Sequence, residues 1–107
     1  MTSEDHNQSL PPLSDLDRLV HEPARLMILA NLYVVESADF TFLMNQTGLT
    51  LGNLSSHLSK LESAGYIRIE KDFVARKPHT MMSLTNDGRD AFRLYRQQME
   101  RFMQGIV

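Results

Sequence analysis

The sequence contains no cysteine, and this absence removes several kinds of chemistry at once. Without thiols the chain forms no disulfide, offers no thiolate to a metal ion and has no cysteine nucleophile. No apolar run approaches the roughly 18 residues of a membrane span. The N-terminus lacks a positively charged start followed by an apolar run, so we expect no signal peptide. We therefore predict a cytoplasmic protein with no membrane partner.

Histidines are few, and their spacing does not suggest a metal site. No two of them stand at the i, i+4 spacing of a helical zinc site, and no cysteine is available to complete a chelate. The four histidines are His6, His21, His57 and His79. We predict no metal and no cofactor.

The stretch Ser55-Ser56-His57 contains the residue types of a nucleophile and a base. Neighbours in a helix point in different directions, whereas a base has to lie within hydrogen-bond reach of its nucleophile. No Gly-x-Ser-x-Gly elbow is present, which leaves only a partner from elsewhere in the chain as a route to catalysis. We predict that the protein is not an enzyme.

The length of 107 residues is that of one domain with a core of its own. The net charge of −2 is unevenly distributed. Residues 1–40 carry a net charge of −5, residues 41–65 are neutral, and residues 66–107 carry +3. This asymmetry is a weak argument for a polyanionic partner of the C-terminal part.

Composition and apolar spacing divide the N-terminal part of the chain. Residues 1–13 are polar, with a Pro-Pro pair and no apolar period, which predicts a disordered arm before a single domain over 14–107. A short apolar face follows over residues 14–20. Pro23 then suits the first turn of a helix, because its missing N–H would be unpaired there. We predict that helix over residues 23–35.

Two further helices with a tight connection come next. Asp39 is an N-cap for a helix over 40–46, and Gly48 ends it. Thr50 caps the following helix over 51–63. Four leucines at i, i+3, i+7 and i+10 form its inward side: Leu51, Leu54, Leu58 and Leu61. A short connection that contains glycine is typical of a helix-turn-helix.

After Gly65 the apolar period changes to two. Residues 66–70 alternate and residues 80–84 alternate less clearly, which predicts two strands joined by a turn over 73–78. Thr85 caps a last helix whose apolar residues repeat at intervals of three and four. These residues are Phe92, Tyr95, Met99, Phe102 and Ile106. The order of elements predicts an α+β, mainly helical fold: a winged helix-turn-helix with a two-stranded wing and a C-terminal helix.

The outward side of helix 51–63 is made of small polar residues, among which only Lys60 is charged. Hydroxyl and amide groups can hydrogen-bond base edges and phosphates in a major groove, and small side chains let the backbone approach. Serine-rich faces also occur on helices that only meet solvent, so this composition alone does not decide. The outward residues are Gly52, Asn53, Ser55, Ser56, Ser59 and Lys60.

The predicted turn of the hairpin is basic. It carries Arg76 and Lys77, with Arg68, Lys71 and His79 nearby. Clustered like charge costs stability unless a polyanion meets it. A turn that only increases solubility is the alternative. Directly after a helix-turn-helix, the basic turn favours contact with phosphates.

Several short motifs resemble those of winged-helix regulators. Ser55-x-His57-Leu58-x-x-Leu61-x-x-x-Gly65-Tyr66-Ile67 resembles the recognition-helix signature of ArsR and MarR repressors. From about Leu16 to Tyr95, the chain is also similar to a compact winged-helix DNA-binding family. The segments that carry this similarity are His21-Glu22-Pro23-Ala24-Arg25-Leu26, Asp39-Phe40-Thr41-Phe42-Leu43, Gly52-Asn53-Leu54-Ser55, Thr85-x-x-Gly88 and Ala91-Phe92-x-x-Tyr95.

The resemblance implies a transcriptional regulator that binds double-stranded DNA as a homodimer. It implies DNA contact by helix 51–63, phosphate or minor-groove contact by the wing over 73–79, and dimerisation through the first and last helices. The expected DNA contacts are Thr50, Gly52, Asn53, Ser55, Ser56, His57, Ser59, Lys60, Arg76, Lys77 and His79. The expected dimer contacts are Phe92, Tyr95, Met99, Phe102 and Ile106. The cysteine signatures of ArsR relatives are absent, so metal regulation is not implied.

Other interpretations stay open. A winged helix can serve as a protein–protein interaction module, which a large apolar patch on helix 51–63 would favour over the small polar residues present. The seam of the last helix can also pack on the core of its own protomer. A small-molecule effector is a further possibility, although little chain is left for a separate ligand domain.

Overall fold

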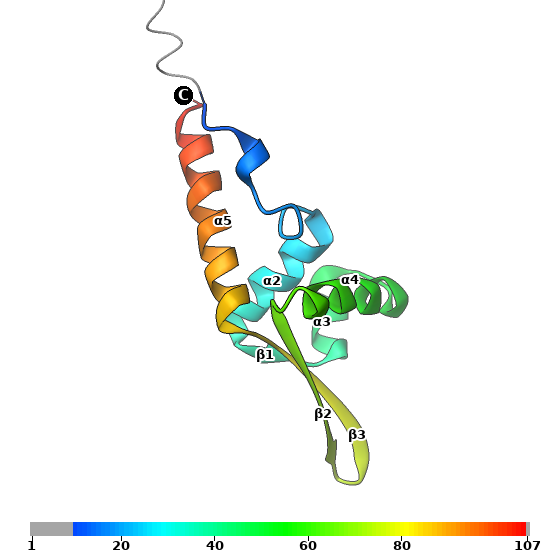
Figure 1. Ribbon diagram of the computed structural model, residues 1–107. Helices are drawn as coiled ribbons and strands as arrows, with labels where there is room; N and C mark the ends of the chain where they lie inside the picture. Colours follow the sequence, from blue (N-terminus) through cyan, green and yellow to red (C-terminus); the bar gives the residue numbers. More distant parts are fainter. Residues whose placement is uncertain (1–9, 107) are drawn as a thin grey trace, which may run out of the picture.

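The structure, a computed structural model, describes residues 10–106. Its elements in chain order are the 3-10 turn η1 (Leu13–Asp15), helix α2 (Pro23–Val35), strand β1 (Ser37–Ala38), helices α3 (Phe40–Thr47) and α4 (Leu51–Ser63), strands β2 (Ile67–Val74) and β3 (Lys77–Leu84), and helix α5 (Asn86–Gln104). Helices α2, α3 and α4 form the centre of the molecule, from which the β2–β3 hairpin and α5 extend in opposite directions (Figure 1). Most of the predicted arm lies outside the described residues, and residues 10–13 lie beside the end of α5.

Helices α3, α4 and α5 begin at the residues that the sequence predicts. The side chain of Asp39 accepts a hydrogen bond from the backbone N–H three residues on at 2.8 Å, and those of Thr50 and Thr85 do the same at 3.2 and 3.0 Å. Each bond satisfies a donor that the first helical turn leaves unpaired. Gly48, at a φ of 72°, ends α3 in the left-handed conformation. The helix-turn-helix of α3 and α4 is confirmed.

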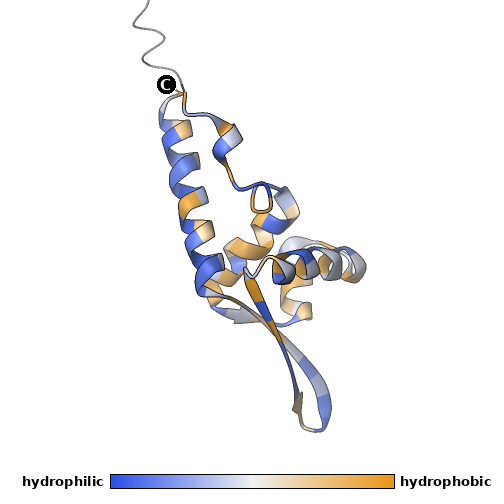
Figure 2. Ribbon diagram, viewed as in Figure 1, coloured by the Kyte–Doolittle hydropathy of each residue, from blue (hydrophilic) through white to orange (hydrophobic). Residues whose placement is uncertain are grey.

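The core lies where α2, α3 and α4 meet the base of the hairpin, and the hydrophobic stretches in Figure 2 converge there. Leu51 was predicted to face inward, but it is 54% exposed, whereas Leu54 in the same first turn of α4 is buried. The buried residues are Leu16, Val20, Ile28, Leu29, Leu32, Ala38, Leu43, Leu54, Leu58, Leu61, Ile67, Met82, Leu84 and Tyr95.

A third strand completes the sheet. Strand β3 pairs antiparallel with β2 on one side and with β1 on the other. A strand at 37–38 was not predicted, because two residues are too short to show an alternating pattern. Tertiary pairing with β3, through Ser37 opposite Ser83 and Ala38 opposite Met82, defines this strand.

The hairpin is longer and its turn tighter than predicted. The expected turn over 73–78 is wrong, because pairing continues to Val74 opposite Lys77. Only Ala75 and Arg76 connect the strands, and their φ angles of 52° and 67° are the positive values that a two-residue type I′ turn needs. Neither residue is the asparagine or glycine that usually signals this turn, so a two-residue turn was not predicted.

The base of the hairpin is tied to the helices by Tyr66. Its hydroxyl donates to the carboxylate of Asp17, which lies in the loop before α2, and this hydrogen bond raises the pKa of Tyr66 to about 12. The bond therefore keeps the phenol protonated, and a donor, above the pH of about 10 at which tyrosine ordinarily ionises. The backbone N–H of Thr85 donates to the carbonyl of Tyr66 at 3.0 Å, and the Thr85 hydroxyl donates to the carbonyl of Gly65 at 2.5 Å. These bonds fix the direction in which the wing leaves the core, and the whole is a winged helix.

Candidate nucleic-acid interface

Helix α4 lies on the surface and exposes the side that the sequence predicts. Its Leu54, Leu58 and Leu61 are buried, so the residues half a turn away face solvent. A Cβ added at Gly52 would meet nothing within 4 Å, so the fold itself does not require a glycine there. The predicted contact residues exposed on or next to α4 are Thr50, Gly52, Asn53, Ser55, Ser56, Ser59 and Lys60.

His57 is half-buried and faces α2 rather than solvent alone. Its Nδ1 lies 3.2 Å from Nη1 of Arg25, and the Nε of Arg25 also donates to the carbonyl of Leu19 at 2.6 Å. A guanidinium can only donate, so Nδ1 accepts and the proton of the neutral ring sits on Nε2. Arg25 therefore fixes both the position and the tautomer of His57. This role was not predicted from the sequence, although both residues belong to the motifs that carry the resemblance.

The two faces of the wing differ in charge. The face turned toward α4, here called the inner face, carries Lys71 as its one charged residue within β2 and β3. The carboxylates of Glu70 and Asp72 point to the opposite, outer face, which they share with Arg68 and Lys77, because successive side chains of a strand alternate. From the core to the tip, the inner face consists of the cross-strand pairs Ile67–Leu84, Ile69–Met82, Lys71–Thr80 and Phe73–Pro78.

The predicted wing contacts lie at different places. Arg76 occupies the tip and Lys77 follows it, and both are exposed. His79 is on the outer face, opposite Asp72, and its Nε2 lies 3.0 Å from the Sδ of Met81. The structure thus brings Arg76 and Lys77 to the end of the wing, but Lys77, opposite Val74, shares the outer face with His79 and points away from α4.

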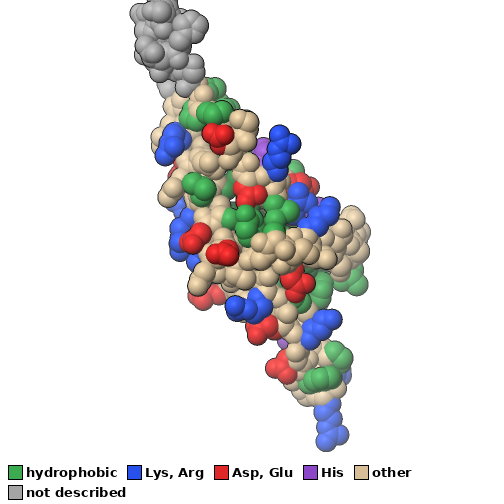
Figure 3. Space-filling view, viewed as in Figure 1, with side chains coloured by type: hydrophobic (Ala, Val, Ile, Leu, Met, Phe, Trp, Pro, Cys, Tyr) green, Lys and Arg blue, Asp and Glu red, His purple; other side chains and the backbone are tan. Residues whose placement is uncertain are grey.

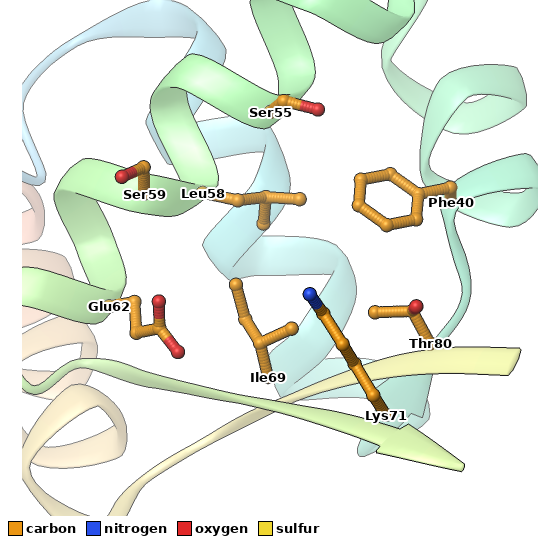
Figure 4. Close-up of a pocket in the computed structure, with 8 residues that line it drawn as sticks. All are labelled: Phe40, Ser55, Leu58, Ser59, Glu62, Ile69, Lys71 and Thr80. Atoms are coloured by element: carbon orange, nitrogen blue, oxygen red, sulfur yellow. The ribbon is translucent and has the colours of Figure 1, made fainter. Parts of the chain in front are cut away.

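A hollow of about 640 Å³ separates α4 from the inner face of the wing (Figure 4). Ser55 and Ser59 line it from α4, and Lys71 and Thr80 line it from the wing. Figure 4 shows Lys71 reaching from the strand toward α4, while Glu62 supplies the one carboxylate among the lining residues. The remaining lining residues are Phe40, Leu58 and Ile69. Hydroxyl and ammonium groups of this kind are suited to phosphate oxygens.

Some of the predicted dimer residues pack within their own protomer, and others lie on the part of α5 that extends past the core. Tyr95 is buried in its own protomer, where its hydroxyl lies 2.8 Å from the Nδ1 of His21, and the ring of Phe92 lies 5.2 Å from that of Tyr33. The far half of α5 extends past the core beside the N-terminal segment (Figure 1). It carries half-buried Met99 and Phe102 and largely exposed Met103 and Ile106.

Within residues 10–106, no three histidine or acidic side chains come close enough together to hold a metal ion. In the same range, no helix combines the length and the hydrophobicity that a membrane crossing requires.

Known proteins resemble this chain in sequence and in fold. An uncharacterised protein of Methanocaldococcus jannaschii is 37% identical over 78 residues, which cover 73% of this chain and 85% of the relative. A transcriptional regulator homologue from Pyrococcus horikoshii OT3 has a TM-score of 0.79 and 27% identity, over 84% of this chain and 89% of that one. The transcriptional repressor CouR, solved bound to a 23-mer DNA duplex, shares the fold with a TM-score of 0.72 and 20% identity, over 86% of this chain and 65% of that one.

The family described as the winged helix DNA-binding domain matches residues 24–103, from the start of α2 almost to the end of α5. This range contains the helix-turn-helix, the wing and the hollow between them. The chain belongs to the winged helix DNA-binding domain family.

Proposed function

We propose that the protein is a transcriptional regulator that recognises a specific sequence in double-stranded DNA, with α4 in the major groove and the wing on phosphates or in the minor groove. One observation carries the proposal. The exposed residues from Gly52 to Lys60 are small or amide side chains and one cation, without a carboxylate, and they adjoin the acid-free inner face of the wing. Such a surface suits a groove lined by hydrogen-bonding base edges and flanked by phosphates.

The hollow supports the same orientation. With α4 in the groove, one sugar–phosphate strand runs between α4 and the wing, where Ser55, Ser59 and Thr80 can donate to phosphate oxygens and Lys71 supplies charge. The protein–protein alternative needs an apolar patch on α4. Leu51 is the one large hydrophobic residue exposed on this helix, so that alternative has less support.

Selection of bound fragments from random duplex DNA, at a stated salt concentration, tests the function. We expect one enriched sequence with two related half-sites. Ser56→Ala and Asn53→Ala, at the middle of the exposed face, are expected to change the enriched bases, because each lost base contact removes about 1–3 kcal/mol of discrimination. Thr41→Ala, at an exposed position on α3, is the control and should leave the enriched bases unchanged. Selection that enriches no sequence would contradict the proposal.

The homodimer is the second part of the proposal. Apolar side chains on the far half of α5 and on the N-terminal segment are exposed there: Leu10, Leu13, Met103 and Ile106. Joining two protomers through this region lets two α4 helices enter successive major grooves about 34–36 Å apart.

Sedimentation equilibrium at micromolar concentration tests the dimer, with an expected mass of twice 12.3 kDa. Met103→Asp is expected to give monomers, because it places a charge in the apolar contact. Leu94→Asp is the matched control, since Leu94 is as exposed as Met103 (55% and 56%) but lies on the opposite side of α5. A monomeric mass for the unaltered protein would refute the dimer.

A further inference from the structure

Two apolar side chains stand uncovered on the inner face of the wing near its tip. Phe73 and Pro78 are cross-strand partners, and the side chain of Phe73 is 71% exposed. We propose that this pair enters the minor groove as an apolar wedge and bends the bound DNA. The inference rests on the proposed function and adds that the protein bends the DNA to which it binds.

The position of the pair gives the first argument. Phe73 and Pro78 continue the row that begins with the buried pair Ile67–Leu84 and passes through Lys71–Thr80. Lys71 and Thr80 line the hollow beside α4. A duplex that sends one strand through this hollow therefore meets Phe73 and Pro78 at the next groove along the wing, and that groove is the minor groove.

Charge around the pair gives the second argument. Arg76 lies at the tip beyond it and Lys71 precedes it on the inner face, whereas Glu70 and Asp72 are on the outer face, together with Arg68 and Lys77. In Figure 3, exposed hydrophobic side chains adjoin the basic end of the wing. Cations that flank an apolar pair suit the minor groove, because its negative potential attracts basic side chains. Pairing with the same surface of a second copy would instead bring these cations together.

The pair is also held firmly. The strands remain hydrogen-bonded beyond it, to Val74 opposite Lys77, and a connection of only two residues closes the hairpin. Apolar wedges of phenylalanine or proline in other DNA-binding proteins partly unstack a base step and bend the duplex. A ladder that runs to the tip can hold such a wedge in place, whereas a long loop would yield.

The test measures bending of the selected duplex by energy transfer between dyes at its two ends. We expect the unaltered protein to bend the duplex, and Phe73→Ser to lose most of the bend and to bind about tenfold more weakly. Val74→Ser is the matched control, because Val74 is the adjacent residue, is 58% exposed and points to the opposite face. It should retain both the bend and the affinity.

The outcomes are separable from those of the proposed function. No binding to duplex by the unaltered protein would contradict the function itself. Tight binding with an equal bend for the unaltered protein and Phe73→Ser would overturn the wedge and leave the function intact. Equal losses of bend and affinity in Phe73→Ser and Val74→Ser would do the same. If Phe73→Ser lowers the sedimenting mass and leaves the bend unchanged, the pair joins protein copies and the wedge is again overturned.

Discussion

Replacing Lys60, Arg76 and Lys77 together with glutamine is expected to remove most of the salt dependence of DNA binding. With Lys71 added by the structure, four exposed cations of each protomer lie on α4 and the wing, or eight in the dimer. Eight phosphate contacts predict a slope of about −7 for the logarithm of the binding constant against that of the salt concentration. The unaltered protein then loses about 10⁴-fold in affinity between about 50 and 200 mM salt. The variant keeps Lys71 alone, and its slope should be about −2.

Fluorescence anisotropy of a labelled duplex, titrated at several salt concentrations, measures both slopes. The matched control replaces Arg89, Arg93 and Arg96 of α5 with glutamine. This control changes the net charge by the same amount on a surface away from α4 and the wing, where Arg89 and Arg93 contact Tyr33. It should keep the steep slope. Equal flattening in both variants would show that net charge, rather than contact by this face, attracts DNA.

The helices were predictable because their signals are local. The side chains of Asp39, Thr50 and Thr85 each accept a hydrogen bond from the backbone three residues on, so the cap and the helix start can be inferred from adjacent sequence. The predicted bounds of α2 and α4 agree with the structure, and α3 ends at Thr47 instead of residue 46. The exposed face of α4 followed from the spacing of its leucines.

The wing was harder to predict because most of it has no buried side. Alternation is clear near Ile67 and Ile69, where one face meets the core, and it disappears toward Phe73, where both faces are exposed. The predicted strands were therefore too short and the predicted turn was too long. The position of Lys71 beside Thr80 and the charge difference between the two faces depend on the register, which only the paired structure provides.

Periodicity also cannot tell which surface an apolar seam covers. The spacing from Phe92 to Ile106 is continuous, yet Tyr95 packs within its own protomer and Ile106 is 55% exposed. The difference arises because α5 is longer than the core on which its first half packs. Contact between Arg25 and His57, which are 32 positions apart, was likewise invisible before the helices were placed in space.

Gly88→Ala is expected to lower the free energy of unfolding by about 3 kcal/mol. A Cβ at this position would overlap the carbonyl oxygen of Tyr66 and lie 2.8 Å from its carbonyl carbon. Both atoms belong to the backbone at the base of the wing, so no side-chain rotation can make room. The first turn of α5 has to move away, which strains the 3.0 Å bond from the Thr85 N–H to the Tyr66 carbonyl. Denaturant titration followed by circular dichroism measures the loss.

Gly52→Ala is the matched control, since Gly52 is also helical but has open space where its Cβ would be. Alanine there is expected to stabilise the fold by up to about 1 kcal/mol, because glycine is the poorer helix former. The same methyl group stands on the face proposed to meet DNA, so DNA binding should weaken while stability rises. Gly88→Ala should instead lower the stability, because its methyl group lies at the base of the wing and not on the face proposed to meet DNA. An unchanged unfolding midpoint in Gly88→Ala would contradict the close contact between α5 and the wing base, because that contact leaves no room for a methyl group.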